Sequence, residues 1–180
     1  MAGNKRAVLF AAVLAASAAQ AAALEVVSAA PSASEAGKKA DFVLSGSVTV
    51  RNIGFEKGAV VMPATEHNGR TYNDIKILSK ALYKKIEACF FKDKCAAAGA
   101  VAAPRIALSG VFPLRSPVRI ANVVLSFDGD LAVTFGAIKR ASGEIKASYP
   151  DNFEAPDGAL KERIDAEVAK AAAAPAPEVK

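Results

Sequence analysis

The stretch VVMPATEHNGRTYNDIKILSKALYKKIEACF, residues 60–90, contains the signals of a strand, a turn and a helix in that order. Pro63 ends the predicted strand, because proline has no amide hydrogen to donate to a continuing ladder. Asn68-Gly69 is the strongest turn signal that follows. Ser79 is placed to cap the helix. The predicted buried stripe of this helix recurs every four residues and consists of Leu82, Ile86 and Phe90.

The residues before this stretch predict further strands. Residues 24–29 form a short apolar strand signal, and residues 31–39 form a polar loop. The segment ADFVLSGSVTVRNIGFEKGAVVMPA, residues 40–64, contains β-branched and apolar runs broken by glycines. This composition favours strands that are joined by tight turns.

The same order of elements follows the small-residue linker AAAGAVAAP. The segments PRIALSGVFPL, VRIANVVLSF, DLAVTFGAIKR and GEIKASYP predict strands, and Asp128-Gly129 is a hairpin signal between the second and the third. Asp157 is placed to cap a final helix. The predicted buried stripe of that helix consists of Leu160, Ile164 and Val168.

The two series of elements indicate a diverged tandem duplication. Aligning Pro63 with Pro150 gives an offset of 87 residues, whereas aligning the two helical stripes gives 78. The second series therefore lacks nine residues between strand and helix, and the missing piece is the polar turn of the opening stretch. The alternative is an accidental match, because strands followed by a helix are common.

The N-terminus has the composition of an export signal. Lys5 and Arg6 precede AVLFAAVLAASAAQA, an apolar run that is too short to span a bilayer and ends in small residues. We therefore expect residues 1–21 to be a secretory signal peptide and the mature chain to be a soluble periplasmic or secreted protein. The alternative is an Ala-rich cytoplasmic helix. The remaining predicted boundaries are copy 1 at 22–95, a linker at 96–103, copy 2 at 104–170 and a disordered tail at 171–180.

The charge of the chain is only mildly basic. It has 23 Lys and Arg against 18 Asp and Glu, a formal net charge of +5. Without residues 1–21 the surplus falls to about +3, because Lys5 and Arg6 are lost. A dedicated duplex-binding domain usually has a stronger or more clustered charge. Composition alone therefore gives little support to nucleic-acid binding.

The reactive side chains are few. Cys89 and Cys95 are the two cysteines, and in an oxidising compartment their closeness favours a local disulfide. Together with the single histidine, His67, they are too few for a convincing zinc site, and we expect His67 to be structural or solvated. No Ser-His-Asp set, phosphate-cradling glycine loop or pair of carboxylates stands out, so we predict no enzyme and no cofactor.

Four segments resemble a known family. They are VRNIGFEKG from Val50, GAVVMPAT from Gly58, NGRTYNDI from Asn68 and KKIEACF from Lys84. Through them, residues 24–91 resemble the SpoVG family, the stage V sporulation protein G or septation-regulator proteins of bacteria. Met-Pro followed by Gly-x-x-Tyr-x-Asp-Ile is the most specific part. Residues 104–170 are similar only in element order and in VVLSFDGDLAV.

The resemblance implies both a fold and a function. The fold would be α+β, with two small antiparallel-sheet-plus-helix units in tandem, packed as an intrachain pseudo-dimer. Family members pair as homodimers and are associated with septum formation, sporulation control and binding of DNA and RNA. The resemblance therefore implies a non-enzymatic regulator of septation or cell division, or a nucleic-acid-binding module. Its partners would be DNA, RNA or another anionic polymer, or envelope or division proteins, and it would act as a monomeric pseudo-dimer or a homodimer.

The sequence departs from the family in three respects. Ala64-Thr65 replaces the basic or polar pair that follows Met-Pro. The second copy has Tyr149-Pro150 and no Gly-x-x-Tyr-x-Asp-Ile turn. The predicted signal peptide also places the domain where chromosomal DNA is absent. The alternative function is therefore an exported periplasmic envelope or interaction scaffold that kept the fold without nucleic-acid binding.

Basic residues near the opening stretch are the candidate contacts for nucleic acid or another anion. Tyr72 and Tyr83 would either stack on bases or serve in packing. Asp74 is expected to hydrogen-bond backbone amides of its turn rather than to act as a general base. The alternative for the basic set is an ordinary solvated helix face, against a sequence-blind attraction for phosphates. The set consists of Arg70, Lys76, Lys80, Lys84 and Lys85, with Lys92 and Lys94 in the following loop.

Overall fold

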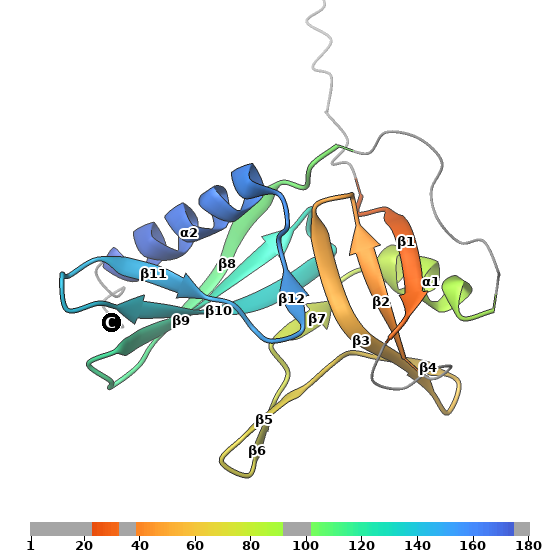
Figure 1. The fold of residues 1–180 in the computed structure, drawn as a ribbon, viewed down its shortest axis with the longest axis horizontal. Helices are drawn as coiled ribbons and strands as arrows, with labels where there is room; N and C mark the ends of the chain where they lie inside the picture. The colour runs from red at the N-terminus through yellow and green to blue at the C-terminus, as the bar shows by residue number, and fades with distance from the viewer. Residues whose placement is uncertain (1–22, 33–38, 92–101, 175–180) are drawn as a thin grey trace, which may run out of the picture.

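The structure is a computed structural model that describes residues 23–32, 39–91 and 102–174. These residues form two antiparallel sheets, a separate two-stranded hairpin and two helices, so the predicted α+β class is confirmed (Figure 1). We call the described residues up to 91 the first half and those from 102 the second half. Neither helix has the combination of length and apolar composition that crossing a bilayer requires, within these described ranges.

The first sheet has the strand order β1-β2-β3-β12, and β4 also pairs with β3. The turn between β2 and β3 places Ser45 and Gly46 at positive φ, +46° and +67°. Tight hairpin turns need this backbone region, because it matches the twist of the flanking strands. The strands are β1 (Val26–Pro31), β2 (Lys39–Leu44), β3 (Val48–Glu56), β4 (Ala59–Val61) and β12 (Phe153–Glu154).

The second sheet has the strand order β11-β10-β9-β8, and β7 also pairs with β10. The predicted hairpin between β9 and β10 is confirmed, with Asp128 at φ +50° and Gly129 at φ +75°. The strands are β7 (Ile75–Ile77), β8 (Ile106–Pro113), β9 (Arg119–Phe127), β10 (Leu131–Lys139) and β11 (Ile145–Ser148).

Each sheet contains one short strand from the other half of the chain. β12, from the second half, is antiparallel to β3, and Phe153 lies opposite Val50. β7, from the first half, is antiparallel to β10, and Ile75 lies opposite Val133. Figure 1 shows β12 beside β3 and β7 beside β10. The sequence pattern predicts neither of these two short strands.

Both helices begin at their predicted caps. The Ser79 hydroxyl accepts a hydrogen bond from Leu82 N at 3.1 Å, and the Asp157 carboxylate accepts one from Ala159 N at 2.9 Å. α1 contacts β1, β4 and β7, whereas α2 contacts β8, β9, β10 and β11. The helices are α1 (Lys80–Cys89) and α2 (Gly158–Ala173). α2 extends past the predicted boundary, so residues 171–173 are helical and not part of a disordered tail.

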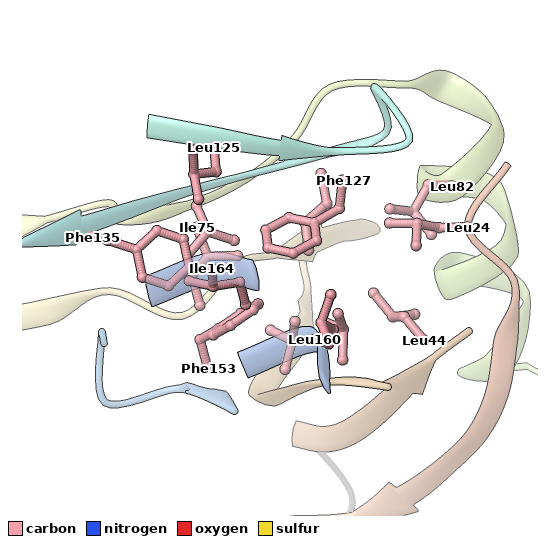
Figure 2. Packing of buried hydrophobic residues seen from close by; sticks show 14 of the residues in the cluster. Leu24, Leu44, Ile75, Leu82, Leu125, Phe127, Phe135, Phe153, Leu160 and Ile164 are labelled. Atoms are coloured by element: carbon pink, nitrogen blue, oxygen red, sulfur yellow. The ribbon is translucent and has the colours of Figure 1, made fainter. Parts of the chain in front are cut away.

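One hydrophobic core joins the two halves. Figure 2 shows Ile75 of the first half among core side chains of the second half. Phe153 lies with its ring centroid 5.5 Å from those of both Phe127 and Phe135. Burial of one such side chain contributes roughly 1.5–3 kcal/mol, so the exchanged strands connect the halves through packing as well as pairing. The predicted stripes are buried in this core at Leu82, Ile86, Leu160, Ile164 and Val168, and Phe90 is partly buried.

The polar turn of the opening stretch is a hairpin rather than a simple connection. β5 (Thr65–His67) and β6 (Arg70–Tyr72) pair antiparallel, and Asn68 and Gly69 turn with φ of +50° and +71°. In Figure 1 this hairpin projects away from both sheets. The corresponding connection of the second half, between β11 and β12, consists of residues 149–152 and contains no hairpin.

Candidate functional site

The predicted basic residues do not form one continuous patch. Arg70 lies on the projecting hairpin, whereas Lys80 and Lys84 lie on α1. Figure 1 shows the hairpin and α1 in separate parts of the molecule. Lys76 is exposed on β7, the strand that leads to α1. Lys92 and Lys94 lie outside the described residues.

Lys85 has a structural role that the sequence did not reveal. Its ammonium donates to Leu24 O at 3.0 Å and forms an ion pair with the Glu25 carboxylate at 2.7 Å. These contacts hold the segment before β1 against α1. Lys85 is therefore engaged within the protein, whereas Lys80 and Lys84 are exposed and form no ion pair with a described residue.

The two candidate tyrosines have different surroundings. The Tyr83 hydroxyl accepts a hydrogen bond from Val60 N at 3.1 Å, which joins α1 to β4. This contact favours packing over base stacking for Tyr83. Tyr72 is 42% exposed on β6 and lines a cavity together with His67.

This cavity has a volume of about 430 Å³ and lies between the β5-β6 hairpin and the second sheet. We call it the hairpin cavity. Its walls come from β5, β6, the connection to β7, the β8-β9 hairpin, β10 and the end of β11. The lining residues are Thr65, His67, Tyr72, Asp74, Leu114, Arg119, Asn122, Thr134, Ser148, Tyr149, Pro150 and Asp151.

Arg119, the first residue of β9, is exposed at this cavity and contacts two neighbouring residues. Its Nε donates to Asn122 Oδ1 at 2.9 Å. The guanidinium lies against Gly136 on the neighbouring strand, where a Cβ atom would be 2.8 Å from Nε and 3.0 Å from Cζ. Gly136 therefore provides the space that the guanidinium fills. Neither Nη group makes a hydrogen bond to a described residue.

Asp74 is anchored through its main chain. Its carbonyl oxygen accepts a hydrogen bond from Thr134 N at 2.7 Å. The carboxylate makes no hydrogen bond within the described part of the chain, so the expectation that it bonds the amides of its turn was wrong. Burial raises the pKa of the Asp74 carboxyl, the charge of Arg119 opposes this, Asp151 adds to it, and Lys76 opposes it.

Tyr149 forms a rigid wall of the cavity. Its hydroxyl donates to Asp165 Oδ1 at 3.0 Å, and its ring meets that of Phe135 edge-on with centroids 5.2 Å apart. Burial, followed by the charge of Asp165 and the hydrogen bond to it, raises the pKa of Tyr149. The phenol of Tyr149 is therefore neutral at physiological pH.

The described residues provide no metal site, and they do not test the predicted disulfide. Among them, no group of three His, Cys, Asp or Glu side chains is arranged to hold a metal ion. Cys89 is the last residue of α1, but Cys95 lies outside the described ranges. The disulfide between them stays a prediction.

Comparisons of the chain with models of known protein families, with curated proteins and with solved structures found no match. The likeness to the SpoVG family therefore rests on the motifs within the sequence. Of the cavity residues, Thr65, Tyr72 and Asp74 belong to those motifs, whereas Arg119 does not. One signal for Arg119 is present in the sequence: an isolated glycine inside a strand, here Gly136, indicates close approach of another group.

Proposed function

We propose that the chain is a non-enzymatic SpoVG-like protein composed of two fused copies that pack as an intrachain pseudo-dimer. Corresponding contacts in the two halves support this proposal. Glu25 N donates to Ser45 Oγ at 3.2 Å, and Arg105 N donates to Asp128 Oδ1 at 3.0 Å. Each contact lies at the tight turn of the central hairpin of its sheet.

The exchanged strands also correspond. Arg51 N donates to Asn152 O at 2.9 Å beside β12, and Thr134 N donates to Asp74 O at 2.7 Å beside β7. Exchange of an identical element between two subunits forms a symmetric dimer. Fusion of the two copies would keep that arrangement within one chain.

We propose that Lys76, Lys80 and Lys84 bind an anionic polymer, with DNA and RNA as the first candidates. The observation that carries this proposal is the exposed pair Lys80 and Lys84. They are one helical turn apart and therefore share a face of α1. Such a face attracts phosphates without reading sequence, and the attraction weakens as salt rises. Arg70, on the hairpin, would supply a separate contact.

By its family resemblance, the proposed process is septation or cell division. The second candidate is an exported envelope scaffold without nucleic-acid binding. The pairing of Lys85 with Glu25 favours it, because it removes one cation from the proposed phosphate surface. Large exposed apolar side chains on β8 and the hairpin after it also favour a protein partner. They are Leu108, Phe112, Leu114 and Val118.

Electrophoretic mobility shifts with duplex DNA and with RNA test the first candidate. The double variant Lys80→Gln with Lys84→Gln should weaken binding roughly tenfold. It should also reduce the slope of the logarithm of the binding constant against the logarithm of salt concentration by about 2, because two phosphate contacts are lost. The matched control, Lys161→Gln with Arg163→Gln, removes the same charge from α2 and should bind as the wild type does.

Two results would contradict this proposal. The first is the absence of any shift of DNA or RNA at low salt. The second is an equal loss of binding in both double variants, because it would mean that only the net charge matters. Fractionation of the host cell tests export separately: cytoplasmic protein that retains residues 1–21 would contradict a cleaved signal peptide.

A further inference from the structure

The hairpin cavity brings opposite charges to its walls without pairing them. Arg119 comes from the second half and Asp74 from the first, and both line the cavity. Their charges interact, yet no ion pair within 4.0 Å joins them. A ligand with one negative and one positive group would complete both interactions.

The Arg119 guanidinium is prepared for a carboxylate. The hydrogen bond from Nε to Asn122 and the close approach to Gly136 orient this exposed guanidinium. Its Nη groups make no hydrogen bond to described residues, so they remain available to a ligand. The fork of an arginine matches the two oxygens of a carboxylate, and such paired charge-assisted bonds are among the stronger hydrogen bonds in proteins.

The Asp74 carboxylate forms the complementary end. It is partly buried and makes no hydrogen bond to a described residue. Asp151, which also lines the cavity, adds negative charge near it. An ammonium group suits this position, because it would donate hydrogen bonds and offset the cost of removing the carboxylate from water.

The size and the remaining walls suit a small molecule. The cavity volume, about 430 Å³, lies within the range of roughly 300–1,000 Å³ that is typical of small-ligand pockets. Tyr72, Leu114 and Pro150 add apolar surface to the charged groups. The cavity therefore combines a few apolar side chains with converging polar groups, as small-ligand pockets do.

We propose that the hairpin cavity binds a small zwitterion, an amino acid or a short peptide, with its carboxylate on Arg119 and its ammonium group on Asp74. The site is a binding site with no chemical step. It uses neither Lys80 nor Lys84, and it does not depend on the nucleic-acid proposal.

Isothermal titration calorimetry of the full chain tests the proposal. The probes are glycylglycine, L-alanyl-L-alanine and the series glycine, β-alanine, 4-aminobutyrate and 6-aminohexanoate, each at constant ionic strength. Acetate and methylammonium carry one charge each and serve as ligand controls. We expect at least one zwitterion to bind. The chain length of the tightest-binding zwitterion then reports the separation of the Arg119 and Asp74 charges. Both controls should bind at least tenfold more weakly.

Two variants, each of which removes one charge from the cavity lining, test which residues bind the ligand. Asp74→Asn and Arg119→Gln should each weaken binding of the best zwitterion about 10- to 100-fold, because each removes a charge-assisted contact. Glu66→Gln, on β5 beside lining residues but not itself lining the cavity, is the control for Asp74. Arg115→Gln, just before β9 and outside the lining, is the control for Arg119. Both controls should bind as the wild type does.

Asp74→Asn keeps the test decisive if Arg119→Gln fails to fold, since no hydrogen bond of the described chain depends on the Asp74 carboxylate. The proposal is overturned if no zwitterion binds the folded chain at 10 mM, if acetate binds as tightly as the best zwitterion, or if folded Asp74→Asn retains wild-type affinity.

Discussion

Each half of the molecule contains one antiparallel sheet and one helix, but the two halves differ in the connection that follows the sheet. In the first half, the connection from β4 to β7 contains the β5-β6 hairpin, whereas in the second half only residues 149–152 join β11 to β12. The shared parts build the common core, and the unshared hairpin builds one wall of the hairpin cavity. The core therefore does not need the hairpin, whereas the candidate site needs the hairpin as well as strands of the second sheet.

The two helices differ in a similar way. Their buried stripes correspond at an offset of 78 residues, which matches Leu82 to Leu160. At the same offset, the exposed Lys80 and Lys84 of α1 correspond to Gly158 and Glu162 of α2. The stripe is therefore common to both helices, whereas the basic face belongs to α1 alone.

The largest expected effect is a loss of stability when the core that joins the two halves is truncated. Phe153→Ala removes a buried ring that links β12 to the second sheet, and it should lower the free energy of unfolding by about 3–5 kcal/mol, as large core truncations do. Urea denaturation followed by circular dichroism measures this change.

Phe91→Ala is the control, because Phe91 is 69% exposed and should contribute much less. If Phe153→Ala lowered stability by no more than the control does, the exchanged strand would not be part of the core. The comparison of the halves through this strand would then fail.

A smaller effect on stability is expected at Asp74, at the end of the connection that contains the hairpin. Asp74 corresponds to Asn152 at the helical offset, so Asp74→Asn makes the first half more like the second. Burial raises the Asp74 pKa above its ordinary value of 3.8 in the folded state. The group therefore contributes stability that is present below pH 3.8 and lost as pH rises through the folded pKa.

The wild type should therefore lose stability relative to Asp74→Asn as pH rises. The melting temperature of Asp74→Asn, relative to the wild type, should increase slightly between pH 3 and pH 7, because the variant has no carboxylate to ionise. Glu66→Gln, at an exposed position of β5, should show a smaller change. A relative melting temperature of Asp74→Asn that falls over this range would mean that the ionised carboxylate stabilises the fold.

The elements with strong local signals were predictable from the sequence. Ser79 and Asp157 cap the helices as expected, and Asp128-Gly129 turns the expected hairpin. These features depend on a side chain and its immediate backbone neighbours, so the sequence contains all of their physical cause.

The exchanged strands and the cavity were not predictable in this way. β7 and β12 have three and two residues, too few to show a period, and their partners lie far away in sequence. Arg119 and Asp74 meet at one cavity only because the strand exchange brings the halves together. The amides near Asp74 in the sequence do not bond its carboxylate, and the cavity that it lines is formed by residues far away in the sequence.

Hydrogen exchange in Phe153→Ala tests most directly whether the halves form one interlocked unit. We predict that the slowest-exchanging amides of β3 and β10 lose the same free energy of protection, because both sheets share one core. A loss confined to β3, with the amides of β10 keeping their wild-type protection, would contradict the account, since the two halves would then unfold independently.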